Sequence, residues 1–543
     1  MSYSPASYNG LTLKPQLQLP YLRKTKHSEP ESFSCRTVSF VVFTRNGIYQ
    51  SKHLSIDLPS DPFLDVVSFI FSYQHDGVSS ALIGSSCGSA ISYSQLYSSV
   101  KSMASGLQQM GISQGDVILL LLPNSIYYPI AFLGVLYLGA IVTTMNPLSS
   151  VAEIKKQIAD TKACHAFTGP ENADKLQALG IPAILVDLAP RPVIKQQDTA
   201  AIMYSSGTTG VSKGVMLTHR NFIAAVAHFV RFEASQYEGS SLDNVYLAVL
   251  PLFHIYGLSL FVMGLLSLGS IVVVMKRFDV NEVIRAIDSC STSIDSIDNK
   301  AKDGLAPHSL KSLKQVSCGA AQLSMKTIED FVQAFPHIDL IQGYGMTETT
   351  AVGTRGFNTE KLRKPSSIGL LAPNMQAKVV DWDTGSPLPP TSTGELWLHG
   401  PGIMKGYLNN ANATLSTIDE EGWLHTGDIV FFDEDGYLHL QDRLKDAIKY
   451  KGFQIAPADL EGVLINHPEI LDVAVAGAMD EESGEVPVAF VVRKHISELN
   501  HDAVMDFVAA QVAPYKKVRK VVFVDSIPKS PAGKILRREL RSH

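Results

Sequence analysis

The sequence predicts an α/β protein in which a large domain precedes a small α+β domain. Short apolar runs at residues 183–187, 200–204, 244–251 and 270–275 have the length and composition of strands, whereas residues 221–232 and 261–269 have those of helices. This alternation is typical of layered α/β architecture with mostly parallel sheets. The chain becomes more charged after about residue 441. We therefore expect a disordered extension over residues 1–50, a large domain over 51–441 and a small domain over 442–543.

The composition is that of a soluble enzyme. The chain has 543 residues, of which 45% are hydrophobic and 18% charged, and a chain of this length forms more than one domain. Its net charge is -6 and its basic residues are spread out, so we expect no nucleic-acid partner. The five cysteines form no C-x-x-C pair, which favours reduced thiols in an intracellular protein over a zinc site or a redox motif.

One uncharged stretch, residues 126–142, approaches the roughly 20 residues that a bilayer span needs. Gly134 and Gly139 interrupt it as they would a close-packed buried helix. It also follows residues 116–123, an apolar run that is typical of a buried parallel strand. We therefore expect a core helix and no transmembrane segment.

The N-terminal 45 residues are rich in Ser and Tyr and lack the apolar region of a secretory signal. We expect a disordered tail there, with a weak transit peptide as the alternative.

A Gly-rich segment, YSSGTTGVSKG at residues 204–214, follows the predicted strand 200–204. The helix after it is expected to begin at Thr218 or Asn221, either of which can act as the N-cap. Glycines allow backbone N–H groups to approach a ligand, hydroxyls add donors, and Lys213 adds positive charge. The segment therefore predicts an anion site, and a flexible solvent loop is the alternative.

This segment is not a Walker A loop, which requires Gly before the Lys and a hydroxyl after it. Here Ser212 precedes Lys213 and Gly214 follows it.

The segment resembles the phosphate loop of the adenylate-forming superfamily, and six further motifs follow it in the family's order. They are LPLFHIYGL (250–258), QGYGMTETT (342–350), GELWLHGPGIMKGY (394–407), GWLHTGD (422–428), DRLKDAIKYKGFQIAP (442–457) and PKSPAGKILRREL (528–540). Over nearly everything after residue 50, the chain is similar to plant 4-coumarate:CoA ligase-like acyl-CoA synthetases.

This resemblance implies a fold and a reaction. The large AMP-binding adenylation domain would include a distorted barrel, and the small C-terminal AMP-binding domain would be a mobile lid. In the first step a carboxylate attacks the α-phosphate of ATP and gives acyl-AMP and pyrophosphate; in the second, coenzyme A displaces AMP. The implied cofactors are ATP, Mg²⁺ and coenzyme A, and the implied acid is a hydroxycinnamate, a fatty acid or an oxylipin of the jasmonate-precursor type.

The resemblance also implies the nucleotide site, where cations and donors must stabilise charge on phosphoryl oxygens. Glu348 would hold Mg²⁺, a hard ion that suits carboxylate oxygens. Lys534, Lys213, Thr347 and Glu348 would be catalytic; for Lys534 the alternative is a solvated basic tail. The implied nucleotide-binding residues are Ser205, Ser206, Gly207, Thr208, Thr209, Lys213, Gln342, Gly343, Thr347, Asp428, Arg443 and Lys534.

The remaining implied roles concern the acid, coenzyme A and the hinge. Lys445 would be the hinge residue of the lid, whose closure excludes water from the reactive anhydride. The acid would contact His254, Tyr256, Gly319, Ala320, Ala321, Tyr344, Lys449 and Gln454, and coenzyme A would contact Arg277, Lys451 and Gly452. The motif wording around Gly257 is closer to relatives that activate fatty or jasmonate-precursor acids than to the lignin enzymes.

Residues 288–312 depart from the family pattern, because relatives carry an apolar, proline-rich run where this chain is polar and shorter. Low hydrophobicity favours a loop there over a core element. The second function hypothesis is therefore a catalytically impaired paralogue or splice form that binds nucleotide or a partner.

The partners implied are the three small molecules, and we expect a monomer. Family resemblance places the pathway in the peroxisome. The chain ends at Arg541-Ser542-His543, which is not an S-K-L-type signal, so import on its own C-terminus is not expected and a cytoplasmic location is the alternative.

Overall fold

The computed structural model describes most of the chain after residue 42. The described residues are 43–44, 46–53, 55–72, 80–86, 88–169, 172, 176, 192–205, 213–235, 244–291, 309–319, 323, 325–356, 364, 366–443, 446, 448–450, 453–455, 457–480, 484–495, 497–512, 514–529 and 535–540. The strand predicted at residues 183–187 lies outside them.

A six-stranded sheet carries the Gly-rich segment. Its order is β17 (Gly406–Tyr407), β8 (Lys213–Thr218), β7 (Thr199–Ser205), β5 (Ile141–Thr144), β4 (Val117–Leu121) and β6 (His165–Thr168). The four strands from β7 to β6 are parallel, and β8 and β17 are antiparallel to their neighbours. All of β4 is buried, as expected for a strand with both faces covered.

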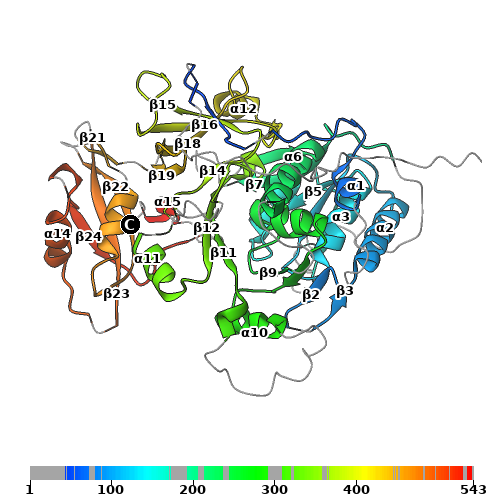
Figure 1. The fold of residues 1–543 in the computed structure, drawn as a ribbon, viewed down its shortest axis with the longest axis horizontal. Helices are drawn as coiled ribbons and strands as arrows, with labels where there is room; N and C mark the ends of the chain where they lie inside the picture. Colours follow the sequence, from blue (N-terminus) through cyan, green and yellow to red (C-terminus); the bar gives the residue numbers. More distant parts are fainter. Residues whose placement is uncertain are drawn as a thin grey trace, which may run out of the picture. The chain divides into compact units, whose positions relative to one another are not determined.

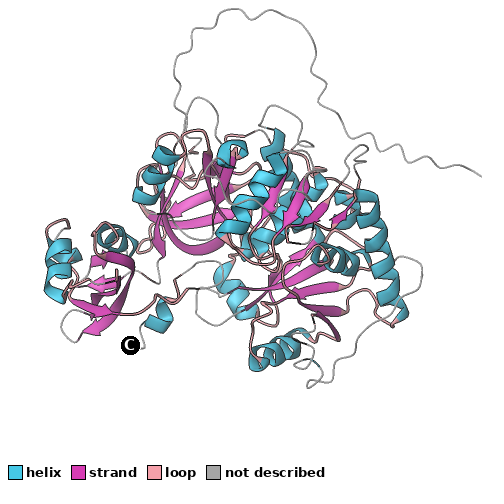
Figure 2. Ribbon diagram, turned by 90° about the horizontal axis from the view of Figure 1, so that it is seen from below, coloured by secondary structure: helices cyan, strands magenta, loops and turns pink. Residues whose placement is uncertain are grey.

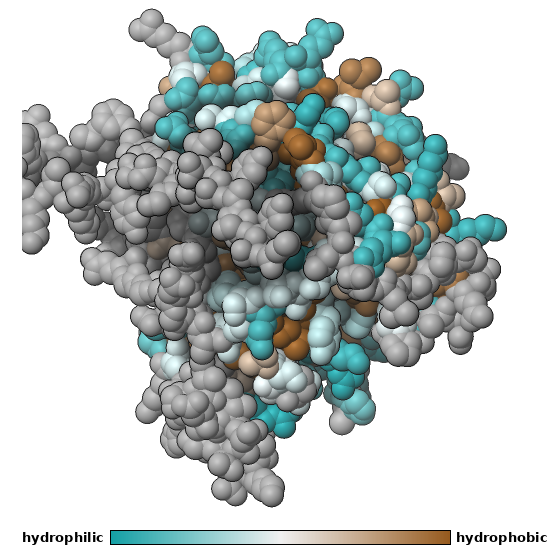
Figure 3. Space-filling model, turned by 90° about the vertical axis from the view of Figure 1, so that its right-hand side faces the viewer, coloured by the Kyte–Doolittle hydropathy of each residue, from teal (hydrophilic) through white to brown (hydrophobic). Residues whose placement is uncertain are grey.

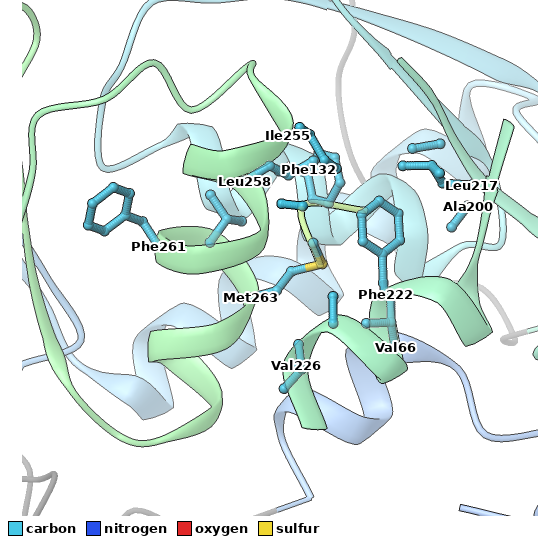
Figure 4. Packing of buried hydrophobic residues seen from close by; sticks show 14 of the residues in the cluster. Val66, Phe132, Ala200, Leu217, Phe222, Val226, Ile255, Leu258, Phe261 and Met263 are labelled. Atoms are coloured by element: carbon cyan, nitrogen blue, oxygen red, sulfur yellow. The ribbon is translucent and has the colours of Figure 1, made fainter. Parts of the chain in front are cut away.

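Helical segments between residues 66 and 267 pack beside the strands of the large domain (Figures 1 and 2). They are α1 (Val66–Ile70), α2 (Tyr93–Gln109), α3 (Tyr128–Tyr137), α4 (Val151–Thr161), α6 (His219–Ala225), the π-helical η1 (Val226–Arg231), α7 (Phe232–Ser235), α8 (Ile255–Gly257), the π-helical η3 (Leu258–Gly264) and α9 (Leu265–Ser267). Of the two candidate caps of α6, the N-cap is Thr218, whose Oγ1 accepts a hydrogen bond from the Asn221 N–H at 3.2 Å. Figure 4 shows Phe222 and Met263 packed together in the core.

The uncharged stretch 126–142 forms a helix and then a strand, so the prediction of one continuous core helix is wrong at its C-terminal end. A Cβ on Gly134 of α3 would lie 2.5 Å from Met103 of α2, which explains the close packing of the two helices. Gly139 has φ +76 and turns the chain into β5. Within the described part of the chain no helix is both long and apolar enough to cross a membrane, and the coloured residues of the face in Figure 3 are mostly hydrophilic with scattered hydrophobic ones.

Two four-stranded sheets follow in the large domain. One has the order β3 (Ala90–Ile91), β2 (Leu82–Gly84), β10 (Ile271–Val274), β9 (Val245–Ala248); the other has the order β11 (Gln315–Cys318), β12 (Asp339–Tyr344), β13 (Thr354–Arg355), β14 (Leu370–Leu371). Their helical segments are α10 (Val280–Ser291), the 3-10 turn η5 (Ser309–Ser312), α11 (Met325–Ala334) and the 3-10 turn η6 (Thr347–Thr349).

The unusual segment 288–312 connects β10 to β11. Its first residues continue α10 to Ser291 and its last form η5, so the interpretation of the whole segment as a loop is wrong at both ends. Residues 292–308 lie outside the described residues.

The large domain also contains an antiparallel sheet. Its order is β1 (Tyr49–Gln50), β15 (Gln376–Val380), β16 (Gly394–His399), β18 (Leu424–Phe432) and β19 (Leu438–Arg443), and α12 (Ala411–Thr417) precedes β18. The Tyr49 ring is buried and stacks on Phe432, with 4.2 Å between ring centroids. The expected disordered extension over residues 1–50 is therefore too long at its C-terminal end, because β1 belongs to this sheet.

The C-terminal region forms a small α+β unit with its own core. The strands are β20 (Ile448–Tyr450), β21 (Phe453–Ile455), β22 (Ile470–Asp480), β23 (Gly484–Arg493) and β24 (Lys520–Phe523), and the helical segments are α13 (Pro457–Leu464), α14 (His501–Ala509), the 3-10 turn η7 (Pro514–Lys516) and α15 (Arg537–Leu540). Buried side chains from α13, α14 and the sheet pack together, including Leu460, Val475 and Val504. The predicted fold class, a large α/β domain followed by a small α+β domain, is confirmed.

A buried histidine predicts acid sensitivity of the large domain. His228 is 1% exposed, and its Nε2 lies 3.2 Å from the Ile56 carbonyl oxygen. Burial lowers the pKa of His228 from 6.5 to about 4. Between these pH values the unfolded chain binds a proton that the folded chain does not, so stability falls as pH is lowered from 6.5 to 4, by on the order of 3 kcal/mol at pH 4.

Thermal unfolding followed from pH 7 to pH 4 measures this loss. His228→Gln removes the titrating group and should flatten the profile, whereas the matched control His495→Gln, at an exposed position, should leave its slope unchanged. An equally steep profile in His228→Gln would exclude His228 as a source of the acid sensitivity.

Candidate functional site

The Gly-rich segment joins two antiparallel strands. Ser205 ends β7 and Lys213 begins β8, and the two residues are paired across the ladder. The expected direct passage from loop to helix is therefore wrong, because the strand β8 comes first. Ser206, Gly207, Thr208 and Thr209 lie outside the described residues. The pairing of β7 with β8 in the six-stranded sheet therefore holds the two ends of the Gly-rich segment together.

Glu348 lies beside this strand pair. It belongs to the turn η6, is 3% exposed, and its Oε1 accepts hydrogen bonds from the Ser205 hydroxyl at 2.7 Å and the Tyr407 hydroxyl at 3.0 Å. Burial, assisted by the Glu348 carboxylate, raises the pKa of the Tyr407 phenol, so this hydroxyl remains a donor. Because both donors act on one oxygen, the other oxygen of the carboxylate suits a divalent cation.

Tyr407 also connects Glu348 to Lys213. The Lys213 Nζ lies 4.7 Å from the centroid of the Tyr407 ring, a cation–π distance. Three elements far apart in sequence, β8, η6 and β17, thus bring a cation, a carboxylate and a phenol together. Thr347 is the neighbour of Glu348 in the same turn.

The sharp turn after β12 depends on Gly345. A Cβ at this position would lie 2.5 Å from the Ala351 carbonyl oxygen, which is closer than side chains tolerate. A larger residue at 345 would move η6 and with it Glu348.

Asp428 lies on β18 and is buried. Its Oδ2 accepts a hydrogen bond from the Tyr344 hydroxyl at 2.5 Å, and its backbone is paired with Arg443 of β19. Tyr344, which was expected only at the acid, therefore contacts the predicted ribose carboxylate. Gln342 and Gly343 precede it on the same strand, β12.

A cavity opens beside β12. Residues predicted to contact the acid or the nucleotide line it, namely His254, Tyr256, Gly319, Gly343 and Tyr344. His254 accepts a hydrogen bond from the Tyr256 N–H on Nδ1, and burial lowers the pKa of His254, so its ring is neutral at neutral pH. The structure brings these residues to one cavity.

Thr354 and Arg355 line the same cavity, and the sequence analysis did not predict either of them as a site residue. It also did not predict Tyr407, which contacts Glu348. An isolated arginine among small and apolar residues, eleven positions after a motif tyrosine, is the signal that could have indicated Arg355.

The other predicted site residues do not line this cavity in the described part of the structure. Arg277 is exposed in the connection between β10 and α10. The backbones of Lys449 and Gln454 are paired between β20 and β21 of the small domain. The following predicted residues lie outside the described residues: Ala320, Ala321, Lys445, Lys451, Gly452 and Lys534.

Two family models match the chain. The model described as AMP-binding enzyme matches residues 74–408, and the model described as AMP-binding enzyme C-terminal domain matches residues 459–534.

Curated plant proteins are similar over almost the full length. The chain is 57% identical over 551 residues to 4-coumarate--CoA ligase-like 6 of Arabidopsis thaliana, with 95% of this chain and 96% of the relative covered. It is 51% identical to 4-coumarate--CoA ligase-like 3 of Oryza sativa subsp. japonica, with 91% and 92% covered. It is 43% identical to Peroxisomal OPC-8:0-CoA ligase 1 of Arabidopsis thaliana, with 91% and 96% covered.

Solved structures have the same fold. ATP-bound MatB from Rhodopseudomonas palustris has a TM-score of 0.78 at 24% identity, with 88% of this chain and 98% of that chain covered. O-succinylbenzoate coenzyme A synthetase (MenE) from Bacillus subtilis, in complex with ATP and magnesium ion, has a TM-score of 0.73 at 26% identity, with 85% and 96% covered.

Proposed function

Because the chain belongs to the AMP-binding enzyme family, and within it to the AMP-forming acid–CoA ligases, we propose that it converts a hydroxycinnamate, fatty acid or oxylipin-type acid to its coenzyme A thioester through an acyl-AMP. The observation that carries this proposal is the position of Tyr344. It lines the cavity and also donates a hydrogen bond to Asp428, so the acid site and the ribose site share one side chain.

Each group has a task in the first step. The acid's carboxylate attacks the α-phosphate and pyrophosphate leaves, so negative charge grows on phosphoryl oxygens. Lys213 and the backbone and hydroxyl donors of residues 205–209 would stabilise that charge, with Thr347 at the α-phosphate. Asp428 would accept hydrogen bonds from the two ribose hydroxyls, after the Tyr344 hydroxyl yields its position.

The described residues fit the implied metal. Glu348 is a buried carboxylate with one oxygen held by Ser205 and Tyr407, and it would hold Mg²⁺ with its other oxygen. When bound, Mg²⁺ supplies charge neutralisation for the phosphates. Lys449 and Gln454 would contact the acid or nucleotide from the small domain, and Arg277, Lys451 and Gly452 would contact coenzyme A.

Domain motion is also part of the proposal. The small domain, residues 442–543, would turn about Lys445 between the two steps, first presenting Lys534 and then the coenzyme A residues. We expect the protein to act as a monomer.

A panel of cinnamates, medium- and long-chain fatty acids and oxylipins, assayed for AMP release with and without coenzyme A, tests the function. We expect at least one class to support AMP release that coenzyme A stimulates. A purified, folded protein that binds ATP and releases no AMP with any acid would contradict it.

That negative result would favour the second candidate, an impaired relative that binds nucleotide or a partner. The segment 288–312 motivates this candidate, because this chain is polar and shorter where relatives carry an apolar, proline-rich run. The strands β9, which precedes the segment in the chain, and β11, which follows it, are end strands of their described sheets. An ATP-induced rise in melting temperature without AMP release is its signature.

We also propose a peroxisomal location, supported by the relative that is named Peroxisomal OPC-8:0-CoA ligase 1. Immunofluorescence of the untagged protein should then show colocalisation with a peroxisomal marker, and a diffuse cytosolic signal would contradict the proposal.

A further inference from the structure

Arg355 is a buried cation in the wall of the acid cavity. It lies on β13, between β12 and β14, and is 3% exposed. An arginine side chain keeps its charge in any protein environment, and burying that charge is costly unless acceptors surround it. A guanidinium at this position must therefore have a structural or a ligand-binding use.

The Arg355 side chain is hydrogen-bonded to Tyr256, which also lines the cavity. Nη1 of Arg355 donates a hydrogen bond to the Tyr256 hydroxyl at 3.0 Å, and the same hydroxyl lies 2.9 Å from the Ser317 hydroxyl. The Arg355 charge also opposes the rise in pKa that burial causes at Cys318. The cation thus acts on the end of the cavity formed by α8 and β11.

Two glycines keep this end open. Gly343 is paired with Arg355, and a Cβ on it would lie 3.4 Å from Arg355 Cδ and 3.7 Å from Nη1. A Cβ on Gly319 would lie 3.5 Å from the Tyr256 ring. Side chains at these positions would fill the space beside the guanidinium and the phenol, so glycine leaves it available to a ligand.

Tyr344 connects the cavity to the proposed nucleotide site. Its hydroxyl contacts Asp428, the predicted ribose carboxylate, whereas Nη1 of Arg355 is hydrogen-bonded to Tyr256. An acid whose carboxylate faces the nucleotide would consequently direct its far end toward Tyr256 and Arg355.

We propose that Arg355 is a specificity-determining residue that recognises an oxygen acceptor at the far end of the acid. This inference rests on the proposed function and narrows its substrate class to oxygenated acids such as hydroxycinnamates. A phenolic, carbonyl or carboxylate oxygen receives a charge-assisted hydrogen bond from the guanidinium. A plain hydrocarbon end would place no acceptor beside the buried guanidinium and the Tyr256 hydroxyl, so it would gain no such bond.

The test uses three acids that differ only at the far end of one skeleton: cinnamate, 4-coumarate and 4-carboxycinnamate. AMP release with ATP, Mg²⁺ and coenzyme A gives kcat/KM for each. We expect the wild type to favour an oxygenated acid over cinnamate by on the order of 100-fold, because a site built for a polar group rejects the analogue that lacks it. Preference between the phenol and the carboxylate identifies the acceptor.

Arg355→Met keeps an unbranched side chain in place of the aliphatic part of the arginine and removes the charged guanidinium, and should reduce the preference to within about threefold. Arg355→Lys keeps the charge without the planar fork and should give an intermediate preference. If Arg355→Met does not fold, Tyr256→Phe provides a second variant that keeps the ring, removes the bridging hydroxyl and should also weaken the preference.

Two outcomes would overturn the proposal: a wild type that does not distinguish cinnamate from the oxygenated acids, or an Arg355→Met variant that loses activity equally with all three. Activation of plain fatty acids alone would refute this inference and leave the ligase function standing. If no acid is activated, the ligase function fails, and calorimetric titration of the three acids still tests whether Arg355 selects among them.

Discussion

Replacing Glu348 by glutamine is expected to lower the rate of acyl-adenylate formation by about 100- to 1000-fold. Glutamine has nearly the same shape, and its amide oxygen can still accept the hydrogen bonds that Ser205 and Tyr407 donate to Oε1. The substitution removes the negative charge that would hold Mg²⁺. ATP–pyrophosphate exchange measured over a range of Mg²⁺ concentrations should show both a lower maximum and a higher Mg²⁺ requirement.

Tyr407→Phe is the matched control for Glu348→Gln. It removes one donor to the same carboxylate and keeps both the charge and the ring beside Lys213. Because a hydrogen bond to a charged group contributes about 1.5–3 kcal/mol, we expect a loss of roughly 10- to 100-fold without a large change in Mg²⁺ requirement. A normal Mg²⁺ dependence of exchange in Glu348→Gln would show that Glu348 does not bind the metal.

The strands and the motif residues near them could be predicted from local patterns. β4 is a continuous apolar run and β7 ends at the Gly-rich segment, so periodicity and turn residues located both. The same rules did not find β8, because Lys213, Gly214 and Thr218 look like parts of a loop and a cap. Its pairing with β7 and β17 is a tertiary property, and such contacts routinely override local preference.

The missed site residues have the same origin. Tyr407 ends one of the motifs and Arg355 follows another, but neither position shows its partner, which lies far along the chain: Glu348 for Tyr407 and Tyr256 for Arg355. The N-terminal boundary failed for a related reason, since Tyr49 is ordered by its stacking on Phe432. Single-sequence patterns describe neighbours along the chain, whereas these residues are defined by neighbours across it.

Lys534→Ala is expected to lower the rate of acyl-adenylate formation by about 100-fold or more, while ATP binding is largely retained. A lysine in this Gly-containing segment would neutralise charge on the transferring phosphoryl group, which is a transition-state effect. The flanking residues support this role over a solvated basic tail. Lys529 forms an ion pair with Asp472 at 2.6 Å, Arg537 forms a double hydrogen bond with Glu461, and Lys529 and Ile535 are bridged across the intervening residues.

ATP–pyrophosphate exchange with a responsive acid separates the two steps of the reaction. Lys534→Ala should lose exchange, whereas Lys451→Ala should retain it and slow thioester formation, because Lys451 is expected to act only with coenzyme A. Lys529→Ala is the matched control, since it removes a neighbouring cation that already has a carboxylate partner, and exchange should stay within about threefold of wild type. Unchanged exchange in Lys534→Ala would mean that another cation stabilises the transferring phosphoryl group. Lys213 would then be the first residue to substitute, because the Tyr407 ring connects it to Glu348.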